Sequence, residues 1–448
     1  MSTEEYLNTL TEQIRCKQAR EAVREEIEGH INDQIEECLQ EGMTKEEAEI
    51  YAVKQMGDPV ETGVSLDRVH RPKVAWSMIV LIGILSILGT VVQYLISVNC
   101  ENTIGFNLTS HLVYTLAGFL IMALMYYLDY SFFGKYGKVM AVIFLGFMFL
   151  QVFFLGREVN GARIFANIGG YSLSLKMLML LYIPVFGGVL YSYRDGGYKA
   201  VVKSMIFLLI PVWITKNMSC LSLSLALFLV MMIMLSVAMV KGWFAVKGKD
   251  LVVTAWSIII FGPALILLLG IKFRWFEEYQ IARITSLFGR GDSSGSSYVY
   301  YKVREIIGSS QLWGRAGNLQ DTSSLLPEIG SGFILTYLIS YYGILTAVLI
   351  GGLLLFLVFK ILKISFRQKN QLGMIIGTGC GSVLGIQILT YLLENLGLMP
   401  YTFVYLPLFS AGGTGIIVTY ALLGIILSIY KYQDIPLKVK SKSIIIHI

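Results

Sequence analysis

Long apolar runs separated by short polar connections occupy most of the chain beyond its first 72 residues. A helix needs roughly 20 apolar residues to cross the hydrocarbon core of a bilayer, and most of these runs come close to that length. We therefore predict an all-α fold: a polytopic membrane bundle of about ten transmembrane helices, preceded by a small soluble helical domain. The predicted spans are residues 74–98, 112–133, 139–155, 173–193, 201–214 (the shortest), 220–240, 251–271, 333–359, 374–393 and 415–429.

Residues 1–72 have a different pattern, in which many charged residues surround isolated apolar ones. Ser2 and Thr44 each have a glutamate three positions later, the capping-box spacing that opens helices. A long helix from about Lys17 is expected to end at Gly42, and a further helix to end at Gly57, because glycine favours the conformation that follows a helix. These residues predict a separate helical bundle.

The long helix of this segment carries an apolar stripe that needs a partner surface. Its members are Ala19, Val23, Ile27, Ile31 and Ile35. The segment as a whole resembles the small cytoplasmic domain that precedes many Gram-positive permeases and sensor proteins. That resemblance implies a regulatory domain with a cytosolic protein partner and no catalysis of its own.

Composition agrees with a membrane protein, since 15% of the 448 residues are charged against about 25% in soluble domains. The net charge of +6 comes from lysines and arginines in alternate connections, the distribution called positive-inside. It predicts a plasma-membrane protein with both termini cytoplasmic, including a tail of residues 433–448, and a large outer loop at residues 272–330. Basic residues scattered beside spans do not predict nucleic-acid binding. Neither the five cysteines nor the four histidines show a metal-ligand spacing.

Candidate chemistry is concentrated in three stretches between spans. The large outer loop contains Lys302, Arg304, Arg315, Asp321 and Glu328. An earlier outer loop, residues 156–172, has two arginines, a residue type suited to binding phosphate. Residues 406–415 are broken by proline and glycine near a membrane boundary, which indicates either a cavity or close helix packing.

Four motifs in and beside these stretches resemble the SEDS family, the FtsW, RodA and SpoVE proteins of cell division, elongation and sporulation. They are NGAR at residues 160–163, Tyr298 with Gly308, Leu312 and Gly314, LPE at residues 326–328 followed by Phe333 and Ile334, and GLMP at residues 397–400 together with LPLFSAGG at residues 406–413. The resemblance covers roughly residues 74–432, within a predicted membrane domain of residues 73–432.

The resemblance implies that the chain polymerises lipid II at the outer leaflet, transferring a glycan from its undecaprenyl diphosphate to the next disaccharide. Such a reaction needs a base for the acceptor hydroxyl and cations for the leaving pyrophosphate. The predicted substrate-binding residues are Arg163, Arg304, Arg315, Lys302, Ser410, Gly412 and Gly413. No cofactor is predicted.

Several acidic positions of the family pattern are missing from this chain. The family's essential aspartate falls on Gly332, and its paired glutamate and lysine fall on Leu175 and Leu178. A glycine cannot accept a proton, so we hypothesise weak or absent polymerase activity unless Glu328 or Asp321 acts as a substitute base. The alternative function is a degenerate scaffold or regulator that binds a class B penicillin-binding protein. A lipid transporter is disfavoured, because the spans hold almost no ionisable residues.

Overall fold

The computed structural model describes residues 1–99, 108–159, 161–272, 298–315, 326, 328–399, 402 and 404–433. They divide into two compact units. The first consists of Met1–Ala75, Arg367–Met374 and Ile429–Ile448, and the second of Trp76–Phe366 and Ile375–Ser428. The predicted domain boundaries at residues 72 and 432 stay predictions.

Four helices form the N-terminal part of the first unit: α1 (Thr3–Glu12), α2 (Lys17–Gln40), α3 (Lys45–Gln55) and α4 (Pro59–Val69). Both capping predictions are confirmed, because the Ser2 hydroxyl accepts the Glu5 backbone N–H, and Thr44 and Glu47 cap each other reciprocally. Gly42 and Gly57 follow the ends of α2 and α3 with positive φ. The sequence therefore defines these helix limits closely.

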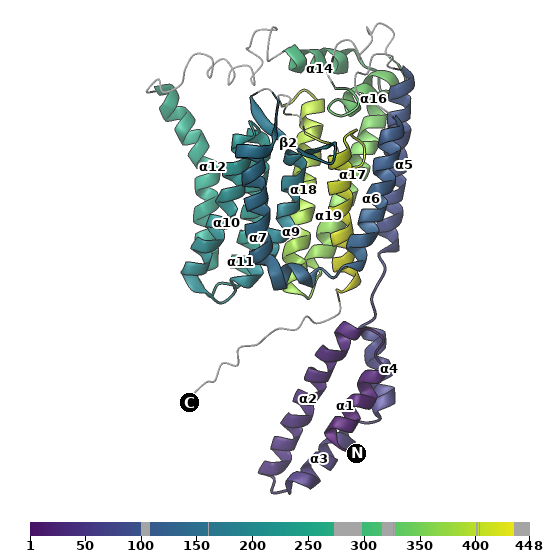
Figure 1. Cartoon of the computed structure of the whole chain (residues 1–448), viewed down its shortest axis with the longest axis vertical. Coiled ribbons are helices and arrows are strands. Elements are labelled where there is room, and N and C mark those ends of the chain that lie inside the picture. The colour runs from purple at the N-terminus through teal and green to yellow at the C-terminus, as the bar shows by residue number, and fades with distance from the viewer. Residues whose placement is uncertain are drawn as a thin grey trace. The chain divides into compact units, whose positions relative to one another are not determined.

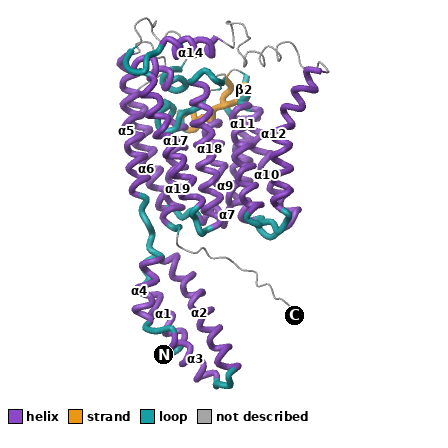
Figure 2. Tube along the Cα trace, turned by 180° about the vertical axis from the view of Figure 1, so that it is seen from behind, coloured by secondary structure: helices purple, strands orange, loops and turns teal. Residues whose placement is uncertain are grey.

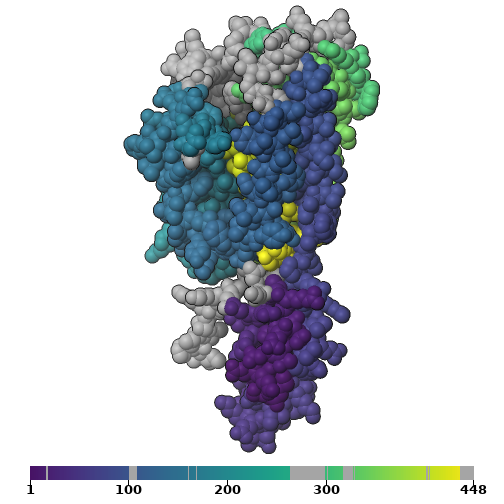
Figure 3. Space-filling model, turned by 45° about the vertical axis from the view of Figure 1, so that its right-hand side comes forward, coloured from purple at the N-terminus to yellow at the C-terminus, as the bar shows by residue number. Residues whose placement is uncertain are grey.

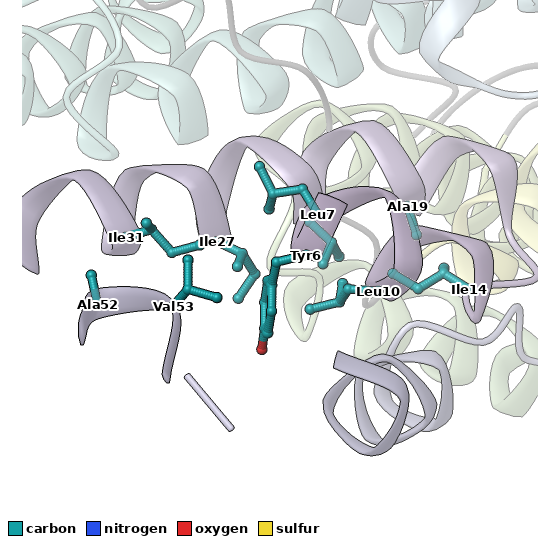
Figure 4. Close-up of a cluster of buried hydrophobic side chains, with 10 residues drawn as sticks. Tyr6, Leu7, Leu10, Ile14, Ala19, Ile27, Ile31, Ala52 and Val53 are labelled. Atoms are coloured by element: carbon teal, nitrogen blue, oxygen red, sulfur yellow. The ribbon is translucent and has the colours of Figure 1, made fainter. Parts of the chain in front are cut away.

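The apolar stripe of α2 finds its partner within the same unit. Ala19, Val23, Ile27 and Ile31 are buried, and Figure 4 shows labelled members of this stripe facing Tyr6, Leu7 and Leu10 of α1. Ala52 and Val53 of α3 complete the cluster, with Ile35 packed at its edge. Burial of this stripe is the main force holding the bundle together.

The membrane part contains nine helices that are long and apolar enough to span a bilayer, counted among the residues with described structure. They are α5 (Trp76–Asn99), α6 (Leu108–Tyr127), α7 with its π-helical end η1 (Ser131–Leu150 and Gln151–Leu155), α8–η2–α9 (Leu175–Leu178, Met179–Leu181 and Tyr182–Ser192), α10 (Gly197–Asn217), α11 (Leu221–Val240), α17 (Ile344–Phe366), α18 (Gln371–Asn395) and α19 (Gly413–Lys431). A further apolar helix, α12 (Gly248–Lys272), matches the predicted span at residues 251–271. These helices run side by side in both ribbon views (Figures 1 and 2), and the predicted polytopic bundle is confirmed.

The predicted outer loop at residues 156–172 lies within a small sheet, which spans residues 157–174. Strands β1 (Arg157–Val159), β2 (Ala162–Ile168) and β3 (Tyr171–Ser174) pair antiparallel in that order. The pairs Val159–Ala162 and Ile168–Tyr171 close two tight hairpins, and the second turn contains Gly169 and Gly170 at φ +57° and +85°. Positive φ at both central residues suits a two-residue hairpin turn. Gly169 and Gly170 therefore form the turn that joins β2 to β3.

The predicted span at residues 333–359 is broken in two. It consists of a short helix α16 (Ile334–Tyr342), then Gly343, then α17. Gly343 has φ +93°, and a Cβ on it would lie 2.6 Å from the Leu312 carbonyl oxygen. The backbone N–H of Gly314 donates to Tyr342 and that of Leu345 to Leu312, so residues 311–314 pair with the break. Hydropathy alone could not show this, because both halves are apolar.

Candidate functional site

A cavity of about 980 Å³ lies at the sheet end of the helix bundle. Its walls come from β2, β3, the start of α8, residues 328–332 and the segment before α19. In the space-filling view (Figure 3), yellow atoms of the C-terminal membrane segment are visible between the blue atoms of earlier helices. The lining residues include Glu328, Gly332, Gly412 and Gly413, four of the positions singled out in the sequence.

Glu328 and Gly332 belong to one tight turn that reaches the cavity wall. The Gly332 backbone N–H donates to the Glu328 carbonyl oxygen over 2.7 Å, and the Ser331 N–H donates to the same oxygen over 3.0 Å. Glu328 has φ +51°, an uncommon conformation for a residue with a side chain, and its side chain is exposed. The turn therefore places Glu328 on the cavity wall, four residues before Gly332, and its carboxylate accepts a hydrogen bond from the Ser331 hydroxyl over 3.3 Å.

Buried side chains from two helices donate hydrogen bonds to the backbone carbonyl oxygens of the turn at residues 328–332. Gln93 of α5 donates from Nε2 to Gly330 over 2.7 Å and to Phe409 over 2.6 Å. Tyr391 and Asn395 of α18 donate to Ser331 over 3.1 Å and to Gly332 over 2.9 Å. Each of these three side chains is fully buried. Because buried carbonyls need partners, these bonds leave the turn little freedom to move.

Ser410 holds the same turn from the segment before α19. Its hydroxyl donates to the Ser331 carbonyl oxygen over 2.6 Å and accepts the Leu406 backbone N–H over 2.9 Å. The Ala411 N–H also donates to the Gly330 oxygen over 2.9 Å. Ser410 is completely buried, so its contacts in the structure position the loop.

The glycines of this segment allow close aromatic packing at the cavity wall. A Cβ on Gly413 would lie 2.6 Å from the Tyr114 ring, and a Cβ on Gly415 would lie 2.6 Å from the Tyr405 ring. Both tyrosines line the cavity. Burial raises the pKa of the Tyr405 hydroxyl well above its usual value, so this group stays protonated at neutral pH. Residues 406–415 were predicted to line a cavity or to pack closely, and in the structure this segment does both.

Lys176 is the one lysine or arginine among the described residues that line the cavity. It lies on α8, directly after β3, and is partly buried. The sequence reasoning passed over it, because the family pattern placed its lysine two positions later, at Leu178. The signal that could have identified Lys176 is its position as an ionisable residue near the start of the predicted apolar span 173–193.

The three predicted arginines do not line this cavity, and each has another contact. The Arg163 guanidinium donates to the Phe153 carbonyl oxygen. Arg304 donates from Nε to the Gly397 carbonyl oxygen over 2.8 Å. Arg315 is exposed, with its guanidinium carbon 4.6 Å from the centre of the Tyr341 ring. None of the three is a lining residue of the cavity described above, and their role in binding substrate stays a prediction.

Of the remaining candidates, Lys302 lies on α14 (Tyr298–Ser309). Lys302 forms an ion pair with Glu305 at 2.7 Å, and this hydrogen bond raises the pKa of the Lys302 ammonium. Asp321 lies outside the described residues. No cluster of three or more His, Cys, Asp or Glu side chains able to hold a metal ion occurs in the part of the chain with described structure.

Comparisons with known proteins agree with this fold. The probable peptidoglycan glycosyltransferase FtsW of Wigglesworthia glossinidia brevipalpis is 26% identical over 314 residues, which are 67% of this chain and 78% of that protein. The probable peptidoglycan glycosyltransferase FtsW of Enterococcus hirae is 27% identical over 318 residues, 69% of this chain and 77% of that protein.

Among solved structures, the rod shape determining protein RodA of Thermus thermophilus superposes with a TM-score of 0.54 at 18% identity, covering 80% of this chain and 97% of that one. A chain from a structure of a peptidoglycan synthase complex has a TM-score of 0.65 at 20% identity and covers 80% of this chain and 99% of that one. The family model for the cell cycle proteins FtsW, RodA and SpoVE matches residues 73–435, so this chain belongs to the FtsW/RodA/SpoVE family.

Proposed function

We propose that this protein polymerises peptidoglycan glycan strands from lipid II, a lipid-linked disaccharide pyrophosphate. One observation carries the proposal: Glu328 and Lys176 line the same cavity, in a family whose relatives are named peptidoglycan glycosyltransferases. A carboxylate and a cation are the two groups that this transfer needs from the protein. Their presence in one cavity favours activity despite the glycine at position 332.

The proposed roles follow from the bonds that change. The acceptor 4-hydroxyl oxygen forms a bond to the anomeric carbon of the donor, and the bond from that carbon to the pyrophosphate oxygen breaks. Glu328 takes the hydroxyl proton, and Lys176 stabilises the negative charge that develops on the leaving pyrophosphate. Gly412 and Gly413 lie on the wall of the same cavity, where their backbone atoms could contact the substrate. Substrate contacts by Arg163, Arg304, Arg315 and Lys302 stay predictions.

The function is tested by strand synthesis from lipid II with the purified full chain, with and without a class B penicillin-binding protein. Wild-type protein is expected to make strands, and Lys176→Ala to lower the rate at least tenfold. Lys203→Ala removes an exposed lysine of α10 that is not a cavity residue, and should leave the rate unchanged. Absence of strands from the wild type in both conditions contradicts the proposal, as does full activity of Lys176→Ala.

A second function, a scaffold that binds a penicillin-binding protein without turnover, is favoured by Gly332 itself. This position has no side chain to accept a proton, and the predicted arginines are bound elsewhere. One of the similar structures is a peptidoglycan synthase complex. Co-purification of the partner with a chain that makes no strands would support this function over the first.

We also infer that both termini are cytoplasmic and that the cavity opens outside the cell, on a Gram-positive-type plasma membrane. Lys135 and Lys138 lie near the start of α7, at the end of the bundle opposite the sheet, and Lys241 and Lys247 lie between α11 and α12 at that same end. Residues 1–72 would then meet a cytosolic partner. Labelling of single cysteines placed at residue 170 and residue 245 tests this: only the first should react with a membrane-impermeant reagent in whole cells.

A further inference from the structure

Two neighbouring residues at the C-terminal end of α18 hold different segments at the cavity. Asn395 donates to the Gly332 carbonyl oxygen, whereas Glu394 bonds the chain that follows α18. Both side chains are buried. Ionisable side chains buried in a membrane domain are rare and usually functional, because removing a charge from water is costly. Glu394 is therefore a candidate for a role beyond the packing of its helix.

The Glu394 carboxylate bonds Thr402, which lies eight residues further along the chain. Its Oε1 atom accepts the Thr402 backbone N–H over 3.1 Å and also accepts the Thr402 hydroxyl. The second carboxylate oxygen, Oε2, is buried and has no hydrogen-bond partner within the described ranges. A single oxygen atom of Glu394 therefore makes both bonds to Thr402.

This contact fixes a segment that forms part of the cavity wall. Val404 and Tyr405 line the cavity, and Thr402 lies just before them in the chain. The same segment is held at its start, where Arg304 of α14 donates to the Gly397 carbonyl oxygen over 2.8 Å. The Thr402 contact comes five residues later, so it sets the course of the backbone that leads directly into the wall.

We propose that Glu394 is a positioning residue of the substrate site, and that its bonds to Thr402 keep the wall at residues 404–405 in the shape that binds substrate. The inference rests on the proposed function and adds a residue that acts on binding rather than on the chemical step. The turn that bears Glu328 has its own anchors in three other buried side chains. Loss of the Thr402 contact should therefore leave the base in place.

The kinetics of strand synthesis from lipid II by the purified full chain test this role. Glu394→Met keeps roughly the length of the side chain and removes both bonds, so KM for lipid II should rise at least fivefold while kcat changes less than twofold. A change confined to KM marks an interaction that contributes equally to substrate and transition-state binding. A fraction of unfolded protein would lower kcat and leave KM unchanged, so a higher KM cannot result from loss of folded chain.

Glu394→Gln separates the hydrogen-bond acceptor from the charge. Its amide oxygen can accept both Thr402 bonds, and its amide nitrogen would take the Oε2 position, which has no partner to lose in the described part of the chain. KM of this variant should stay within twofold of the wild-type value. Glu61→Met, at an exposed glutamate of α4, is the matched control for the methionine substitution and should change neither constant.

Thr402→Val tests the contact from its other side. It removes one of the two bonds, so it should raise KM by a smaller factor than Glu394→Met does. Combined with Glu394→Met it should raise KM no further, because substitutions of two residues in direct contact are not additive.

An unchanged KM in Glu394→Met would overturn the inference. Equal rises of KM in Glu394→Met and Glu394→Gln would also overturn it, since the charge would then matter and not the bonds to Thr402. Should the wild type make no strands, the polymerase function fails, and equilibrium binding of lipid II to the same variants tests the inference alone. Glu394→Met should then weaken binding at least fivefold and Glu394→Gln less than twofold, and equal affinities would overturn the inference.

Discussion

The side-chain amide of Asn395 donates a hydrogen bond to the Gly332 carbonyl oxygen over 2.9 Å, and both residues are buried. The same asparagine accepts the backbone N–H of Thr336 over 3.1 Å, at the start of α16. One side chain of α18 therefore fixes the position that lacks the family's aspartate and also satisfies the first turn of the helix that follows it. Asn395 positions the turn that bears Glu328 and is not itself a lining residue of the cavity.

Replacing Asn395 with leucine should lower both stability and strand synthesis. The change leaves the Gly332 carbonyl and the Thr336 N–H buried without this partner, and each unsatisfied group costs about 1–3 kcal/mol. Asn217→Leu is the control, since that exposed asparagine bonds only its own helix at Trp213. Thermal unfolding and strand synthesis measure the two effects. An Asn395 variant with wild-type stability and rate would show that the turn does not depend on this bond.

Gly343 should not tolerate alanine, whereas Gly352 should. Gly343 has φ +93°, and a Cβ there would lie 2.6 Å from a backbone oxygen, so Gly343→Ala should destabilise the protein by about 1–3 kcal/mol. Gly352, within α17, has open space around it, and alanine there should be neutral or stabilising by roughly 0.5–1 kcal/mol. The melting temperature of Gly343→Ala should therefore fall, whereas that of Gly352→Ala should stay the same or rise. Equal losses for both would contradict the account of the helix break.

Asp67 makes the stability of the N-terminal bundle depend on acid. Burial alone would raise its pKa, but the Arg15 backbone N–H and the Arg71 side chain bond its carboxylate and hold the pKa below the usual value. A carboxyl with a depressed folded-state pKa stabilises the fold above its unfolded pKa of about 3.9, and this contribution disappears as pH falls through the folded value.

We expect residues 1–75, expressed alone, to fold and to lose stability as the pH is lowered through this range. Asp67→Asn should reduce that acid dependence and should lower stability at pH 7. Asp33→Asn, at an exposed position of α2, should do neither. Helical circular dichroism against urea at several pH values gives the comparison. Parallel pH profiles for wild type and Asp67→Asn would contradict the role of this carboxylate.

Much of the helical architecture follows from the sequence for a simple physical reason. A span must be apolar over its whole length, and the helices of residues 1–72 carry their own caps, so local sequence contains the signal. The sheet at residues 157–174 and the break at Gly343 depend on hydrogen bonds to residues that are near in space. Such contacts produce no repeating pattern of apolar and polar residues from which they could be predicted.

The candidate site was predicted only in part for the same reason. Motif order identified Glu328, Gly332, Gly412 and Gly413, which all line the cavity. It did not identify Lys176, because the family motif has its lysine two positions later, where this chain has Leu178. Residue type suggested the arginines, but Arg304 and Arg163 bond backbone carbonyls in the structure. The direction of a side chain cannot be deduced from its charge.

The central claim is that Glu328 replaces the missing aspartate as the base. It is tested most directly by the rate of strand synthesis from lipid II for Glu328→Gln relative to wild type, with Glu305→Gln as a control on the exposed face of α14. Removing a general base typically lowers a rate about 10²–10⁴-fold, so Glu328→Gln should lose most activity while Glu305→Gln keeps it. A Glu328→Gln protein that makes strands at the wild-type rate would contradict the account.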